Sequence, residues 1–134
     1  MSRFAAPHRR RDRGLAAWRR GHGAETFAAL FLMLKGYRIL ARRLVTPRGE
    51  IDLVARRGRL IVFVEVKARP TLEQALGALT PSVCRRLSRA AYAAVAQHAH
   101  WGDAAKRLDA IAIVPGRWPV HRRNLIVDDP WGRV

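Results

Sequence analysis

The chain has 134 residues, of which 49% are hydrophobic, and its 26 basic against 10 acidic residues give a formal net charge of +16. This length allows one compact domain with a real core and excludes two. Nearly all of the positive charge is arginine, since only Lys35, Lys67 and Lys106 are lysines. Such an excess favours an anionic partner, above all nucleic acid, over a membrane surface, because no basic amphipathic helix is evident. The alternative is an arginine-rich composition that provides only solvated charge.

The single cysteine, Cys84, excludes an internal disulfide and a cysteine zinc site. This composition fits a reducing cytoplasm. The longest apolar run, residues 27–34, is too short to cross a bilayer, and no secretory signal is evident. We therefore expect a cytoplasmic protein without a membrane partner.

In chain order, residues 1–21 predict a basic, flexible arm, or equally a solvated tail without a role, and residues 22–134 a single domain. Apolar residues at helical spacing predict a first helix over 23–35, which Gly36 ends. The other predicted elements are strands over 37–45, 50–55 and 60–68, a helix over 80–98, and strands over 108–114 and 120–127. The order α-β-β-β-α-β-β predicts an α/β fold with one mixed sheet packed against helices.

The third predicted strand carries charges that a buried strand does not need. Its sequence is LIVFVEVKA, with Glu65 and Lys67 among apolar residues. If Ala55 pairs with Leu60 across a four-residue turn, Asp52 lies opposite Phe63 and diagonal to Glu65. Because side chains alternate between the two faces, this register places the three charged residues on one face. An exposed ion pair of Glu65 with Lys67 is the simpler alternative.

Two further acids belong to the same prediction. Glu50 would face Glu65 directly, and this like-charge pair would need a cation beside it. Glu25 is the only charged residue of the first helix before Lys35, so it is either buried at a cost or placed in an exposed first turn. Carboxylate oxygens suit Mg²⁺ or Mn²⁺, and the carbonyl oxygen of Val66 is a possible additional ligand.

The segments AE at 24–25, KGYRILARRL, GEIDLVA and LIVFVEVKAR resemble the YraN-like family of small bacterial proteins. They also resemble the wider PD-(D/E)XK nuclease superfamily, whose restriction endonuclease-like core has the predicted α-β-β-β-α-β order. The resemblance runs from about residue 21 to residue 127. It places Asp52 and Glu65 at the two acidic positions of the superfamily motif, Lys67 at its lysine and Glu25 at the glutamate often found on the first helix.

The resemblance implies a metal-dependent nuclease that hydrolyses phosphodiester bonds, with DNA favoured over RNA. Asp52, Glu65, Glu25 and Val66 would hold Mg²⁺ or Mn²⁺, and Lys67 would complete the catalytic set. A homodimer is an option, because many junction-cutting members of the superfamily act as dimers. The arginines expected to hold the nucleic-acid backbone are Arg56, Arg57, Arg59, Arg85, Arg86 and Arg89.

Two other functions remain open. The first is a non-catalytic nucleic-acid-binding protein, accessory to DNA repair or recombination, that keeps the nuclease fold. The second is a structural protein bound to a large RNA. Most of the four tryptophans are expected in or near the core, although a tryptophan can also stack on an unpaired base. No histidine is assigned a role, and His121 is expected on an edge strand.

Overall fold

A computed structural model describes residues 22–125 of the chain. The predicted N-terminal arm and the last residues, with Trp18 and Trp131, lie outside this range. The described part consists of α2 (His22–Leu34), β1 (Arg38–Thr46), β2 (Gly49–Arg57), β3 (Leu60–Ala68), α3 (Leu72–Gly77), α4 (Pro81–Gln97), a short 3-10 turn (Ala99–Trp101), β4 (Ala105–Ile113) and β5 (Val120–Arg122).

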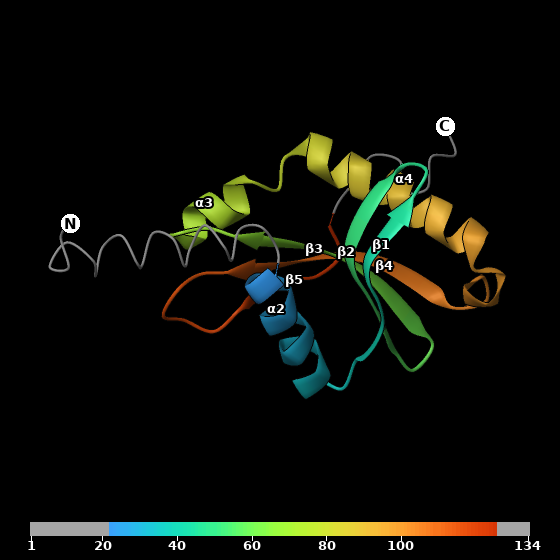
Figure 1. Cartoon of the computed structure of the whole chain (residues 1–134), viewed down its shortest axis with the longest axis horizontal. Helices are drawn as coiled ribbons and strands as arrows, with labels where there is room; N and C mark the ends of the chain where they lie inside the picture. Colours follow the sequence, from blue (N-terminus) through green and yellow to red (C-terminus); the bar gives the residue numbers. More distant parts are fainter. Residues whose placement is uncertain (1–21, 126–134) are drawn as a thin grey trace, which may run out of the picture.

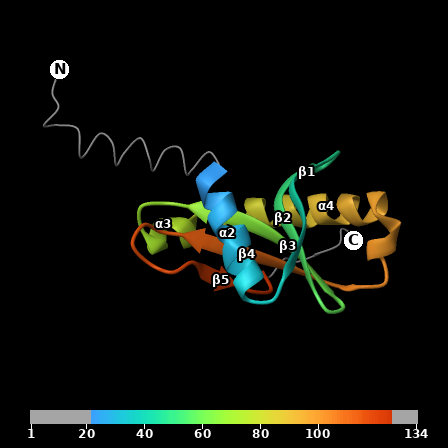
Figure 2. The ribbon, with the colours of Figure 1, turned by 60° about the horizontal axis from the view of Figure 1, so that its bottom comes forward.

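The five strands form one mixed sheet in the order β1-β2-β3-β4-β5. All neighbouring strands are antiparallel except β3 and β4, which are parallel and are joined by a crossover through α3 and α4. The two views of the ribbon place α2 on one face of the sheet and α4 on the other (Figures 1 and 2). The predicted α/β fold with a mixed sheet is confirmed.

Two apolar cores explain why β3 reads as an almost continuous hydrophobic run. Val62 and Val64 point into the core beneath α2, whereas Ile61 and Phe63 point into the core beneath α4. A strand that is covered on both faces has no solvent side, so period-two alternation of apolar and polar residues disappears. Glu65 and Lys67 are therefore the exceptions, as charged side chains in an otherwise apolar strand.

Local signals account for the helix boundaries. Gly36 adopts a φ of +90°, which ends α2 in a conformation that side chains disfavour. Thr80 caps α4 by accepting a hydrogen bond from the Val83 N–H, and Pro81 occupies the first turn. The short helix α3 was not predicted, although Thr71 caps it in the same way through Gln74. Six residues are too few to give a periodic apolar pattern.

The last strand is shorter than predicted. The sequence indicated a strand over 120–127, but β5 ends at Arg122. Asn124 has a φ of +58°, and its N–H donates to the Asp109 carboxylate at 3.0 Å rather than to a neighbouring strand. A side-chain acceptor has therefore replaced the sheet ladder at this point. Among the described helices, none has the length and apolar character needed to cross a membrane.

The two leucines near the end of α2 provide a test of this packing. The Leu32 side chain is fully buried between α2 and the sheet, whereas the Leu34 side chain is 77% exposed. We expect Leu32→Ala to lower the free energy of unfolding by about 2–5 kcal/mol, because it removes apolar contacts and leaves a cavity. Leu34→Ala should change it by about 0.5 kcal/mol or less. Urea unfolding followed by circular dichroism measures both, and equal effects would contradict the assigned helix face.

Candidate functional site: an acidic cluster where β2 leaves β3

The turn between β2 and β3 sets the register of the acidic residues. Arg57 pairs with Leu60, and Leu53 pairs with Val64, so the turn is two residues long and contains Gly58 at a φ of +62°. The predicted pairing of Ala55 with Leu60 is wrong by two residues, since a tight two-residue turn is favoured where a glycine accepts positive φ. Continuing the observed register places Asp52 beside Glu65 rather than beside Phe63.

This correction keeps the predicted face, because a shift by two residues does not change the alternation of side chains. Glu65 and Lys67 form an ion pair on that face, and Asp52 lies within electrostatic range of both. The predicted opposition of Glu50 and Glu65 is wrong. Glu50 instead pairs with Val45 in the β1–β2 hairpin and is exposed.

Asp52 occupies the point where β2 separates from β3. The ladder between the two strands ends at Leu53 and Val64. Beyond it, the Asp52 carboxylate accepts a hydrogen bond from the Val66 N–H at 2.7 Å. The strand also turns here, because Ile51 packs beneath α4 whereas Leu53 packs beneath α2. The carboxylate thus satisfies a backbone donor that the departing strand no longer satisfies.

Glu65 is buried and paired with two cations. Its Oε2 atom lies 2.9 Å from the Lys67 Nζ and 3.0 Å from an Arg86 guanidinium nitrogen on α4. The alternative of an exposed ion pair is therefore wrong, since the side chain of Glu65 is 6% exposed and that of Lys67 17%. Both contacts end on the same oxygen, so Oε1 lies outside these ion pairs. Arg86, expected to hold a nucleic-acid backbone, instead neutralises an acid in this structure.

Glu25 is also buried, at 3% exposure, which excludes the open first turn considered from the sequence. Its two carboxylate oxygens contact Arg42 at 3.3 Å and Arg43 at 3.1 Å, both from β1. Consecutive residues of a regular strand point to opposite faces. Arg43 has a φ of +51°, a strained value outside glycine, and this break in the strand accompanies the approach of both arginines to one carboxylate.

Asp52 differs from the other acids of the cluster because none of the described cations forms an ion pair with it. Burial, and then the negative charge of Glu65, raise the pKa of Asp52 to about 6, against the opposing effects of the Val66 N–H and Lys67. A divalent cation would remove this penalty, and the oxygen donors of Asp52 and Glu65 suit Mg²⁺ or Mn²⁺. The chemistry of these two residues therefore fits such an ion.

The geometry supports a two-carboxylate site rather than a larger one. Within residues 22–125, no three acidic, histidine or cysteine side chains lie close enough together to hold a metal ion. Glu25 acts on Asp52 electrostatically, but both of its oxygens are engaged by arginines. A further ligand would have to come from backbone oxygen, such as that of Val66, from water or from substrate.

The other arginines predicted to contact nucleic acid lie in different places. Arg56 and Arg59 are at the β2–β3 turn, where the Arg56 guanidinium donates to the Gly58 carbonyl. Arg85 and Arg89 are exposed on α4. Arg57 stacks over the Tyr37 ring at 4.5 Å and donates to the Lys35 carbonyl, so it belongs to a second polar network.

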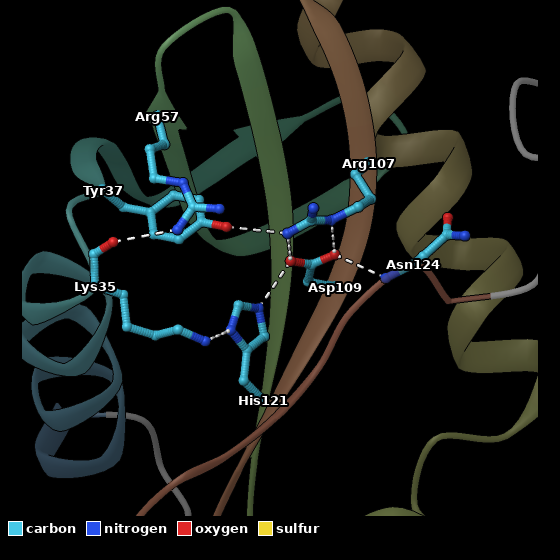
Figure 3. Close-up of polar contacts among 7 residues, drawn as sticks. All are labelled: Lys35, Tyr37, Arg57, Arg107, Asp109, His121 and Asn124. Carbon is cyan, nitrogen blue, oxygen red and sulfur yellow. Dashed lines mark hydrogen bonds and ion pairs between the residues drawn. The ribbon is translucent and has the colours of Figure 1, made fainter.

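That second network surrounds Asp109, which is fully buried on β4 (Figure 3). Arg107 makes two hydrogen bonds of 2.8 Å to the Asp109 carboxylate, His121 contacts it at 2.8 Å through Nε2, and the Asn124 N–H donates to it. Burial opposes ionisation of Asp109, yet these donors hold its pKa at about 2. Asp109 therefore carries its charge inside the protein.

The network extends from Asp109 to the surface at the end of α2. The second ring nitrogen of His121, Nδ1, lies 2.6 Å from the Lys35 Nζ, and Arg107 also donates to the Tyr37 hydroxyl (Figure 3). The sequence analysis placed His121 correctly on an edge strand but assigned it no role. The sequence feature that could have indicated this network is Asp109 itself, because it is a single acidic residue in an apolar strand, as Glu65 is in β3.

Fold and site together define a small α/β protein with a mixed sheet and an acidic cluster at the point where two strands part. The model of the uncharacterised protein family UPF0102 matches residues 24–113, and the chain belongs to this family, as its YraN-like resemblance indicated. A UPF0102 protein of Parvibaculum lavamentivorans is 56% identical over 108 residues, which cover 81% of each chain. Another, from Methylobacterium nodulans, is 52% identical and covers 90% of this chain and 92% of its own.

The raised pKa of Asp52 makes a prediction about stability. A pKa raised on folding stabilises the protein fully below the unfolded value, near 3.8, and this contribution is lost as the pH rises through about 6. Asp52→Asn should therefore gain stability relative to the wild type between pH 4 and pH 7.5, by an amount on the order of 2–3 kcal/mol. Denaturant unfolding at both pH values measures this gain.

The exposed Glu50, on the same strand, provides the control. Glu50→Gln should show a much smaller change between the two pH values, since its carboxylate is solvated in the folded protein. A stability difference between Asp52→Asn and the wild type that stays constant from pH 4 to pH 7.5 would contradict the assigned environment of Asp52.

Proposed function

We propose that this protein is a metal-dependent nuclease that hydrolyses phosphodiester bonds in nucleic acid, with DNA favoured over RNA. The observation that supports it is the placement of Asp52 beside Glu65 and Lys67, where Asp52, unlike Glu65 and Glu25, takes part in none of the described ion pairs. Accepting the Val66 N–H explains why a polar side chain lies here, but it does not require a carboxylate without a cation, since an unpaired, partly buried carboxylate costs stability. Perturbed carboxylates of this kind are often found at functional sites.

In this proposal, each residue of the acidic cluster has a separate role. Asp52 and Glu65 would hold Mg²⁺ or Mn²⁺, the Val66 carbonyl would be a third ligand, and Glu25 would contribute through a water-bridged contact. The bound ion would polarise a phosphoryl oxygen and lower the pKa of a water molecule. Lys67, whose Nζ lies 2.9 Å from Glu65, would stabilise negative charge that develops at phosphorus.

The remaining basic residues would hold the substrate. Arg85 and Arg89 are exposed on α4, the helix that also carries Arg86 to Glu65. Arginines near the site would contact phosphates without reading sequence, and such binding weakens as salt increases. The arginine-rich composition, with a net charge of +16, supports a polyanionic substrate over a small neutral one.

A second function is favoured by a different observation. Glu65 and Glu25 already have two basic partners each, so most of the acidic charge is neutralised without a metal. This arrangement fits a nucleic-acid-binding protein that keeps the nuclease fold without cleavage, acting as an accessory factor in repair or recombination. The names of the related proteins state the family only.

Cleavage assays separate the two functions. The purified protein would be incubated with single-stranded, duplex and branched DNA and with RNA, in the presence of Mg²⁺ or Mn²⁺. We expect cleavage by the wild type, and a rate roughly 10²- to 10³-fold lower in Lys67→Met, because a group that stabilises transition-state charge is lost. Glu65→Gln should lower the cleavage rate as well, since it removes the negative charge of a proposed metal ligand.

The control for these variants is Glu73→Gln, which neutralises an exposed acid on α3 that makes none of the described ion pairs of the cluster and should cleave at the wild-type rate. Melting temperatures and circular dichroism show whether each variant is folded. Nucleic-acid binding without any cleavage, unchanged in Lys67→Met, would favour the accessory function instead.

Metal binding can be tested without activity. At pH 7.5, a tenfold excess of Mg²⁺ over its dissociation constant should stabilise the protein by about 1.4 kcal/mol, since the ion binds the folded state. At pH 5, below the pKa of about 6 of Asp52, the same Mg²⁺ concentration should stabilise the protein by only about 0.4 kcal/mol, because about a tenth of the carboxylate is ionised, and the effect should vanish in Asp52→Asn at either pH. Thermal unfolding at constant ionic strength measures it, with Glu73→Gln as the variant that should respond like the wild type.

A further inference from the structure

The polar network around Asp109 ends at an ammonium group on the surface. Because an ionised carboxylate only accepts hydrogen bonds, the His121 Nε2 must donate to Asp109, which leaves Nδ1 to accept from the Lys35 Nζ at 2.6 Å. The Lys35 side chain, from the end of α2, is thus held by a buried histidine (Figure 3). An ammonium has three donors, and this contact uses one of them.

Positive charge gathers around Lys35, which forms no ion pair with an acid of residues 22–125. Burial lowers the pKa of Lys35, and the charges of Arg123 and Arg57 lower it further. The charge of Asp109 raises this pKa, but Arg107 already forms an ion pair with Asp109, and His121 donates a hydrogen bond to it. Arg123 is exposed and forms no ion pair with any residue of the range 22–125. Three cations placed together in this way attract an anion.

An exposed aromatic surface adjoins these cations. Trp118, in the loop before β5, is 69% exposed, and its ring lies 6.4 Å from that of Phe31 on α2. The Lys35 Nζ lies over the same Phe31 ring at 5.2 Å. Lys35 and the Trp118 indole therefore both contact the Phe31 ring. A large aromatic group left in solvent beside several cations is the combination that binds unpaired nucleotides.

We propose that Lys35, Arg57, Arg123 and Trp118 form a contact site for single-stranded nucleic acid, here termed the Lys35 site. Its basic side chains bind a backbone phosphate, and Trp118 stacks on an unpaired base. Lys35 supplies a point charge held in place by His121, and the arginines supply forked donors suited to phosphate. The inference rests on the proposed function for its class of ligand, but it needs neither a metal ion nor cleavage.

The Lys35 site is separate from the acidic cluster but within reach of one strand. Glu25 and Lys35 lie at opposite ends of α2, ten residues apart, which corresponds to about 15 Å along a helix. A few nucleotides span this distance. The Lys35 site would therefore hold the unpaired strand beyond the position of the acidic cluster, which predicts a preference for substrates with single-stranded segments.

Binding of fluorescein-labelled 15-nucleotide single-stranded DNA and RNA, and of a blunt DNA duplex, tests this inference in EDTA. Trp118→Ala should weaken single-strand binding roughly 5- to 150-fold, the range expected for losing one stacked base, and affect the duplex much less. Arg123→Gln and Lys35→Met should each weaken binding and reduce the salt dependence by about one phosphate contact. Lys35→Arg should restore most of the affinity because it keeps the charge.

The matched control is Arg48→Gln, which removes one exposed positive charge at the β1–β2 turn, at the far end of β1 from Lys35. It should leave single-strand affinity within about twofold of the wild type. Trp118→Phe should retain binding but lose the quenching of indole fluorescence that the oligonucleotide causes in the wild type. Because Trp118 and Arg123 are exposed, their variants should fold normally.

Single-strand affinity unchanged in both Trp118→Ala and Arg123→Gln would overturn the Lys35 site, as would an equal loss in Arg48→Gln. Absence of any single-strand binding would overturn it as well. If the proposed nuclease function is wrong but the Lys35 site is right, the result differs. The protein would then bind single strands through this site and cleave no nucleic acid in the presence of Mg²⁺ or Mn²⁺.

Discussion

The need to neutralise buried carboxylates organises this protein. The buried acids of the described chain are Glu25, Glu65 and Asp109, and each has two basic partners. An unpaired buried charge would cost several kcal/mol, so the folded protein needs these partners for its stability. Most of the pairs join different elements. Glu65 links β3 to α4, Glu25 links α2 to β1, and Asp109 links β4 to β5, so the same contacts also hold the layers together.

Asp52 is the exception that gives the fold a candidate function. It has a backbone donor where the other acids have cations, and its pKa of about 6 reflects that difference. Its position follows from the sheet itself, because β2 leaves β3 at this residue and the Val66 N–H needs an acceptor. Burial and the negative charge of Glu65 disfavour the ionised Asp52 carboxylate, and the proposed metal ion would offset both effects.

Arginine serves two purposes in the chain, and the structure separates them. Arg42, Arg43, Arg86 and Arg107 neutralise internal acids, so their charge contributes little to an external field. Others, such as Arg85, Arg89 and Arg123, are exposed and remain available to an anionic partner. Net charge alone could therefore not identify the binding surface. The positions of the unpaired cations relative to Trp118 and to the acidic cluster are what suggest how one strand of nucleic acid would lie.

The sequence by itself determined most of the elements, their order and the face that Asp52, Glu65 and Lys67 share, since these depend on local periodicity and on turn residues such as Gly36. It did not predict the short helix α3 or the end of β5 at Arg122. Family membership was likewise readable from short motifs. Only the tertiary structure decided the β2–β3 register, the partners of Glu25 and Glu65, and the contact of Lys35 with His121 across 86 positions of sequence. Register depends on one turn, and long-range pairs depend on how helices pack on the sheet. No local pattern encodes either of them.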